Sequence, residues 1–180
     1  LLKCLQKKHK ANICAYAGYP LTNRPLERNF YEKIKWYIGI FLSYRYFGVY
    51  KSLGVKKFIY PDISKSLKLS GIKKFKSIIQ KVRSNRDIEE IKINGIVIGD
   101  LIYDSYLKLK FKETINVNDP DFQEYLKESI QLFLFWEKYF NRNQIKAVIL
   151  SHSVYFLGMF ARIALKKGIK VYVCHPDYLN

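Results

Sequence analysis

The chain has 180 residues, of which 49% are hydrophobic and 16% aromatic, and it carries 32 Lys and Arg against 15 Asp and Glu, a formal net charge of +17. This apolar content suffices for one buried core and excludes a globally disordered chain. The longest mainly apolar stretch, Trp36 to Tyr50, is shorter than the roughly 20 residues of a spanning helix and contains Arg45, so we expect no transmembrane helix.

The net positive charge lies entirely in the first half of the chain. Residues 1–86 contain 20 Lys and Arg and 3 acidic residues, whereas residues 87–180 contain 12 of each kind. A localised basic surface attracts nucleic acid, anionic lipid headgroups or a polyanionic substrate. The alternative is an ordinary solvated surface in a lysine-rich proteome, and the sequence leaves both open.

The cysteines and histidines are too few and too scattered for a structural metal site. Cys4, Cys14 and Cys174 lack CxxC spacing, and no HExxH motif is present. Unpaired cysteines suit a reducing compartment. We therefore expect a cytoplasmic protein without a bound metal.

The first half of the chain predicts alternating strands and helices. A short apolar run over 11–17 indicates a buried strand that ends at Gly18, and 55–60 indicates a second strand. Between them, apolar residues at three- and four-residue steps predict one helix over 27–53. The segment 63–82 predicts a cationic amphipathic helix, because its apolar residues form one stripe and its lysines lie largely off it.

The second half predicts two long helices and a closing βαβ unit. Residues 91–98 indicate a short strand or strand-like connection, and Gly99 to Lys110 a helix. Asp119 followed by Pro120 is a strong start signal for the next helix, which runs to about 139–141. The strands expected at 145–150 and 169–173 are joined by a helix over 154–167.

The two closing strands are continuously apolar, and one helix joins them, so they must pair in parallel. This pattern predicts an α/β fold: a Rossmann-like, open and mostly parallel sheet with helices on both faces. We expect residues 1–180 to form a single domain that is a fragment of a longer two-domain protein.

Ligands of open α/β sheets bind at the carboxyl ends of the strands. This rule selects three places: Gly18-Tyr19-Pro20 after the first strand, Pro61-Asp62 after the second, and the turn Ser151-His152-Ser153 after the strand at 145–150. Ser153 is placed to cap the following helix, and the imidazole of His152 suits a general base. The alternative is a capping turn with a satisfied histidine.

A second candidate site lies on the helix that starts at Gly99. Asp100 and Asp104 share one face of that helix, and Tyr103 lies beside Asp100. Paired carboxylates can orient sugar hydroxyls or share a proton. Equally, Asp100 can stabilise the helix start and Asp104 can pair with Lys108, and neither contact requires a function. No phosphate-binding glycine loop or nucleophile elbow is present.

The strings GIVIGDLIYDSYLK (95–108) and ILSHSVYFLGMFARIALKKGIKVY (149–172), with the aromatic helix after Asp119-Pro120, resemble the amino-terminal halves of bacterial capsule and lipopolysaccharide glycosyltransferase-like proteins. These proteins are thought to have two Rossmann-like domains of the GT-B type. The similarity covers mainly residues 91–175. The first 90 residues match only in general layout.

The resemblance implies a metal-independent transferase whose amino-terminal domain recognises a glycan or lipid-linked glycan acceptor. The nucleotide sugar donor would be bound by a carboxy-terminal domain that this chain lacks, so the fragment alone would be inactive. The resemblance also implies which residues line the crevice, with His152 or one of the aspartates as base: Asp100, Tyr103, Asp104, His152 and Tyr155.

Two other functions remain open. One is a nucleic-acid-binding module that uses the basic first half, although no recognisable motif supports it. The other is a different sugar or nucleotide enzyme on the same fold. For the transferase, we further expect the basic helix to hold the protein peripherally at the inner membrane through four lysines: Lys73, Lys74, Lys76 and Lys81.

Overall fold

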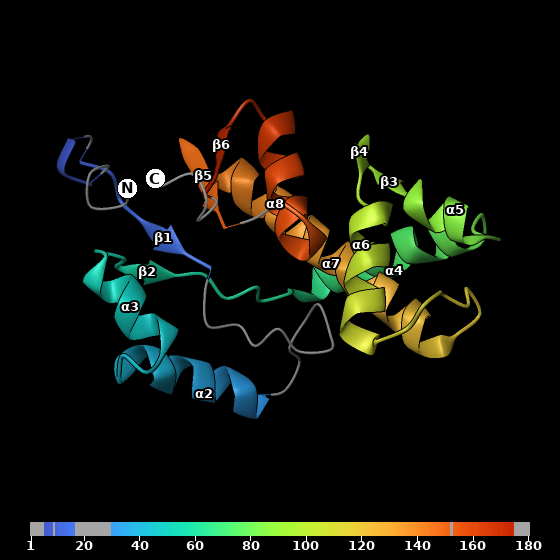
Figure 1. The fold of residues 1–180 in the computed structure, drawn as a ribbon, viewed down its shortest axis with the longest axis horizontal. Helices are drawn as coiled ribbons and strands as arrows, with labels where there is room; N and C mark the ends of the chain where they lie inside the picture. The colour runs from blue at the N-terminus through green and yellow to red at the C-terminus, as the bar shows by residue number, and fades with distance from the viewer. Residues whose placement is uncertain (1–5, 9, 17–29, 152, 175–180) are drawn as a thin grey trace. The chain divides into compact units, whose positions relative to one another are not determined.

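The computed structural model describes residues 6–8, 10–16, 30–151 and 153–174. The chain divides into two compact units, residues 1–61 and residues 62–180, each described by itself below (Figure 1). In the described part of the chain, no helix has the length and apolar character needed to cross a membrane.

The first unit contains one parallel strand pair. Strand β1 (Cys14–Ala15) pairs with β2 (Lys57–Phe58), and the N–H of Ile59 donates to the carbonyl of Ala15 at 2.8 Å. Ala15 of β1 and Val55, which precedes β2, are buried and form a small apolar cluster. Both predicted strands are therefore confirmed, although each is shorter than the apolar run that predicted it.

The single helix predicted over 27–53 is wrong. Its described part forms two helices, α2 (Phe30–Phe41) and α3 (Tyr46–Ser52), and residues 17–29 lie outside the described residues. The chain turns between the helices because Ser43 and Arg45 adopt left-handed backbone angles, with φ of 55° and 51°. Neither glycine nor proline marks this turn, so the helical periodicity continues through it in the sequence.

Aromatic rings join the two helices of the first unit. Trp36 of α2 is buried and meets Phe47 of α3 edge to face, with ring centroids 5.8 Å apart. Trp36 also contacts Tyr60, and Phe47 contacts Phe58 of β2. These edge-to-face pairs form the core of the unit.

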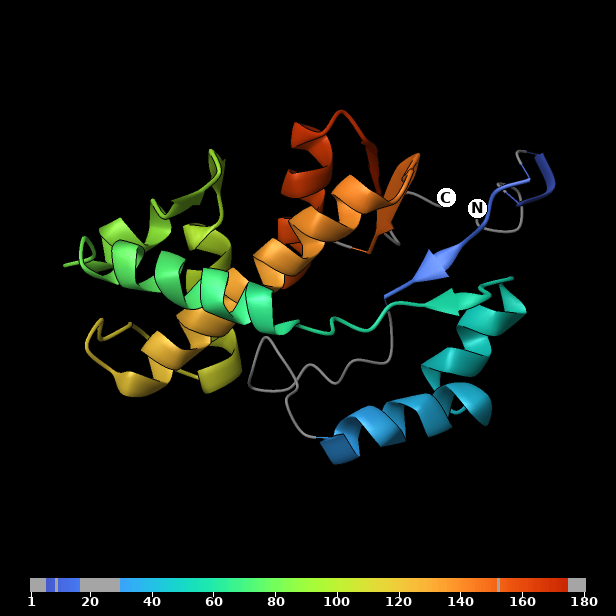
Figure 2. The same cartoon turned by 180° about the vertical axis from the view of Figure 1, so that it is seen from behind.

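The second unit is built around α7 (Pro120–Arg142), which starts as predicted with Asp119 as its cap and Pro120 as its first residue. The side chain of Asp119 accepts a hydrogen bond from the N–H of Asp121 at 3.0 Å. Almost every residue of α7 from 125 to 136 is at least half-buried. Helices α4, α6 and α8 pack against it (Figures 1 and 2), so this helix has no broad solvent-facing side.

The basic helix α4 (Lys65–Ile79) begins at a Ser64 cap and packs on α7. It is followed by a short helix, α5 (Asn85–Glu89), which the sequence analysis did not predict. Ser84 and Asp87 form a reciprocal capping box at the start of α5. The sequence carried this signal, because Ser followed three residues later by an acidic side chain is typical of a helix start.

Residues 91–98 form a β-hairpin and not a single strand. Strands β3 (Lys92–Ile93) and β4 (Ile96–Val97) are antiparallel and are joined by Asn94 and Gly95, which have φ of 51° and 73°. Positive φ at both loop residues is typical of a type I′ turn, for which Asn-Gly is the preferred sequence.

The closing βαβ unit is confirmed. Strands β5 (Ala147–Leu150) and β6 (Lys170–Val173) pair in parallel over four residues each, and α8 (Tyr155–Lys166) connects them. Helix α6 (Gly99–Lys110) has the predicted bounds. The α/β class is thus shown, whereas the described strands pair two by two and form no extended Rossmann-like sheet.

Candidate functional site

Helices α6 and α8 lie side by side and run in opposite directions. Asp100, in the first turn of α6, contacts Arg162, near the end of α8. Lys108, near the end of α6, lies over the ring of Tyr155, at the start of α8, with its ammonium 4.1 Å from the ring centroid. Two of the predicted crevice residues, Asp100 and Tyr155, therefore make contacts between these two helices.

Asp100 is engaged on both of its oxygens. The guanidinium of Arg162 donates to Oδ1 and Oδ2 at 2.6 Å each and also donates to the carbonyl of Val97 at 2.8 Å. Burial opposes ionisation of Asp100, but the hydrogen bonds and charge of Arg162 outweigh it and lower the pKa of the carboxyl. An ionised carboxylate with both oxygens paired fixes α6 on α8, which favours the helix-stabilising alternative for Asp100.

Asp104 is different. Its side chain is exposed, and within the described residues it has no hydrogen bond or ion pair. The alternative pairing with Lys108 does not form, since the ammonium of Lys108 lies over Tyr155 instead. Because Asp104 precedes Lys108 by about one helical turn, it lies on the same face of α6 as Lys108. Tyr103, the neighbouring candidate, is half-buried.

The turn after β5 presents further polar groups at the carboxyl end of that strand. Ser151 and Ser153 are exposed and Tyr155 is half-buried. The prediction that Ser153 caps α8 is wrong, because Val154 is the N-cap residue and no side chain caps the helix. His152 and Gly18, both candidate site residues, lie outside the described residues.

Of the residues that the resemblance places in one crevice, Tyr155 lies at the start of α8, whereas Asp100 contacts its last turns, roughly 10 Å away along the helix axis. We define the candidate site by the turn after β5 and by the residues of α6 on the face that carries Lys108: Asp104, Lys108, Ser151, Ser153 and Tyr155.

The four lysines predicted to meet a membrane are not equivalent. Lys73, Lys76 and Lys81 are exposed, but Lys74 is half-buried and donates to Oδ1 of Asn94 at 3.1 Å. Lys74 and Lys81 also line a groove of about 420 Å³ between α4, α5 and the hairpin. Lys74 therefore has a structural contact that the pattern of charges did not reveal.

Asn94 is a structural centre that the sequence analysis missed. Besides accepting from Lys74, its amide donates to both carboxylate oxygens of Glu137 at 2.9 and 2.8 Å. Its backbone carbonyl accepts from Lys166 at 2.5 Å. The hairpin loop thus connects α4, α7 and α8. The Asn-Gly pair signals the turn, but nothing in the sequence identifies the three distant partners.

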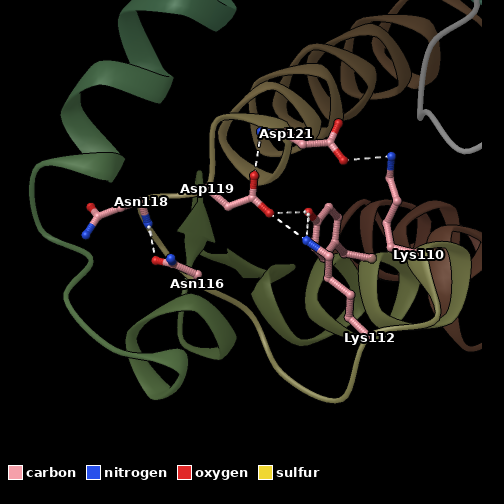
Figure 3. A network of polar contacts seen from close by, with 7 residues as sticks. Lys110, Lys112, Asn116, Asn118, Asp119 and Asp121 are labelled. Carbon is pink, nitrogen blue, oxygen red and sulfur yellow. Dashed lines mark hydrogen bonds and ion pairs between the residues drawn. The ribbon is translucent and has the colours of Figure 1, made fainter.

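A second polar network anchors the start of α7 (Figure 3). Oδ2 of Asp119 accepts from Lys112 at 2.7 Å and from the hydroxyl of Tyr106 at 3.1 Å, while Lys110 pairs with Asp121 at 2.7 Å. The hydrogen bond from Lys112 is the main cause that lowers the pKa of Asp119. These contacts cap the helix and leave little of the network for binding a ligand.

Among the described residues, no group of three or more His, Cys, Asp or Glu side chains could hold a metal ion. Comparisons of the chain with protein-family models, with curated proteins and with solved structures find no match.

Proposed function

We propose that this chain is the acceptor-binding part of a metal-independent glycosyltransferase that builds a bacterial surface polysaccharide. The resemblance of residues 91–175 motivates the proposal. The observation that carries it is the candidate site itself, in which the ammonium of Lys108 lies over the ring of Tyr155 after β5, and the exposed carboxylate of Asp104 precedes Lys108 by about one turn of α6. In this proposal, the fold is the Rossmann-like open sheet of the GT-B type.

The residues of the candidate site offer the two kinds of contact that a sugar makes, an apolar ring face and hydrogen-bonding groups. The ring of Tyr155 offers a flat apolar face for sugar C–H groups, and Lys108 holds that ring from one side. The carboxylate of Asp104 can accept hydrogen bonds from acceptor hydroxyls, and the hydroxyls of Ser151 and Ser153 can donate or accept them. The paired Asp100 contributes by holding α6 in place.

In the transfer step, a base removes the proton of the acceptor hydroxyl while its oxygen bonds to the anomeric carbon of the donor sugar and the nucleotide phosphate leaves. Asp104 is our candidate for this base in the described part of the chain, and His152 is the alternative. By the same resemblance, the nucleotide sugar would be bound by a second, carboxy-terminal domain.

Binding of the 180-residue chain to an array of bacterial surface oligosaccharides tests the proposal. One lost hydrogen bond is worth about 1 kcal/mol, so Asp104→Asn should weaken glycan binding about fivefold. The single variant Tyr155→Ala should weaken glycan binding more than Asp104→Asn does. Glu113→Gln is the matched control, since this carboxylate is also exposed but lies in the loop before α7. Absence of glycan binding, or equal binding by the Asp104 and Glu113 variants, would contradict the proposal.

A further inference from the structure

The first unit exposes an unusual number of large apolar side chains on α2 and the turn after it. Eight of them are exposed, and seven of these lie on α2 or directly follow it, including Phe41 at 84% and Phe30 at 76%. Single exposed apolar residues are common on soluble proteins, but a contiguous group marks an interaction surface. We call this group the α2 surface: Phe30, Tyr31, Ile34, Tyr37, Ile38, Phe41 and Leu42.

The α2 surface is one continuous side of the helix. At 100° per residue, the seven side chains fall within an arc of about 140°. The buried residues of α2, Trp36 and Gly39, lie on the opposite side, where Trp36 packs against Phe47. The helix therefore has two apolar sides, of which the core of the first unit covers one.

Positive charges border the α2 surface. Lys33 lies at one edge of the arc and Lys35 at the other, and Arg45 lies in the turn that follows. All three cations lie over aromatic rings: Lys33 is 5.3 Å from the ring centroid of Tyr60, Lys35 4.4 Å from that of Tyr31 and Arg45 5.0 Å from that of Tyr44. Over residues 1–61 the chain has 12 Lys and Arg and 2 acidic residues.

We infer that α2 lies in the surface of an anionic lipid bilayer, with the α2 surface embedded at the boundary between headgroups and acyl chains. An apolar arc with lysines at both edges is the pattern of an interfacial helix, and the charge of the unit complements an anionic leaflet. The tyrosines have an apolar ring and a polar tip, which suits the same boundary.

Other partners fit the α2 surface less well. Nucleic acid would use the rings for stacking and the cations for phosphates, but it gives no role to the exposed aliphatic side chains of Ile34, Ile38 and Leu42. A protein partner would cover the same rings, but the cations that border the arc favour an anionic surface. The inference does not depend on the transferase proposal, because glycan binding and vesicle binding are separate measurements.

The experiment is flotation of the 180-residue chain with vesicles of phosphatidylcholine alone and with roughly one-third phosphatidylglycerol. The test variant is the double change Phe30→Ser and Phe41→Ser. The control is Phe111→Ser, which removes a phenylalanine that is 95% exposed in the second unit. Because all three side chains are exposed, circular dichroism should show unchanged folding of both variants.

We expect the chain to bind the anionic vesicles, and the double variant to bind about tenfold more weakly or worse, since binding scales with the apolar area embedded. The control should bind as the unchanged chain does. Part of the binding should also persist in about 0.5 M salt, because the apolar contact is not screened.

Several results would overturn the inference. One is the absence of binding to anionic vesicles, and another is equal binding by the double variant and the control. If Lys73→Gln with Lys76→Gln abolishes binding while the double phenylalanine variant binds normally, α4 is the membrane contact. If the chain self-associates and the double variant does not, the α2 surface binds a second copy of the chain. If the chain binds RNA in preference to vesicles and the double variant does not, the α2 surface binds nucleic acid.

Discussion

Helices α2 and α7 both carry aromatic residues on more than one side, but they use them in opposite ways. The rings of Phe122, Phe133 and Trp136 in α7 are buried, because helices α4, α6 and α8 pack against α7. In α2, Phe30 and Phe41 are exposed while Trp36 is covered. An apolar residue on every side of a helix therefore does not mean that every side is buried: in α2 the core of the first unit covers the side of Trp36 and leaves the α2 surface exposed.

The largest expected difference in stability is between alanine substitutions of two phenylalanines, one in α7 and one in α2. Phe133→Ala removes a fully buried ring from α7 and should lower the free energy of unfolding by about 3–5 kcal/mol. Phe41→Ala removes a ring that is 84% exposed and should change it by no more than about 0.5 kcal/mol. Urea denaturation measures both. Comparable losses would mean that the chain covers the α2 surface itself, and the contrast between the helices would disappear.

Close packing in the second unit can be tested at the start of α6. A Cβ on Gly99 would lie 1.8 Å from the carbonyl oxygen of Ile88, so Gly99→Ala should cost about 3 kcal/mol of stability. The comparison variant is Gly95→Ala in the hairpin loop. There the new Cβ meets only the flexible end of Lys166, and the cost is the strain of a positive φ, about 1 kcal/mol. An inverted order of the two losses in thermal unfolding would show that α5 and α6 are not closely packed.

The two aspartates of α6 also differ, because Asp100 is paired with Arg162 and Asp104 is exposed. Asp100→Asn should cost about 1 kcal/mol at neutral pH, a modest value because the side chain is 41% exposed. The folded-state pKa of Asp100 lies below the ordinary value of 3.8, so its stabilisation is present above that pH and is lost as the pH falls below it. The difference in the free energy of unfolding between the unchanged chain and the Asp100→Asn variant should therefore become smaller below about pH 4. A difference that stays constant to lower pH would rule out the ion pair as its source.

The smallest expected effect is that of Asp104→Asn. Because Asp104 is exposed and has no polar partner within the described residues, its loss should change the free energy of unfolding by less than about 0.5 kcal/mol. The measurement is the same urea titration. A larger loss would indicate a structural role and would remove the reason for placing Asp104 in the candidate site.

Much of the second unit could be predicted because its signals are local. The Asp119-Pro120 start and the βαβ pattern depend on a few adjacent residues, and both are confirmed. The Asn94-Gly95 hairpin was equally local, and its turn signal was available in the sequence. The break between α2 and α3 was not available, since Ser43 and Arg45 are not residues that mark positive φ.

The candidate site was only partly predictable, for a different reason. The sequence places Asp100 and Asp104 on one face of a helix, but it does not reveal that Arg162, 62 residues later, takes both oxygens of Asp100. Whether a carboxylate is available for chemistry depends on such distant partners. The spacing in the sequence therefore identifies the two aspartates as candidates, but only the structure shows which carboxylate remains accessible to a ligand.

The contacts of Asn94 also set an order for folding. The hairpin loop can close within microseconds from neighbouring residues, but its partners lie 20, 43 and 72 residues away in Lys74, Glu137 and Lys166. The last of these bonds must wait until the ribosome has released α8. A chain interrupted before α8 would leave the loop without this third anchor, so we expect the second unit to acquire its full resistance to proteolysis only late in synthesis.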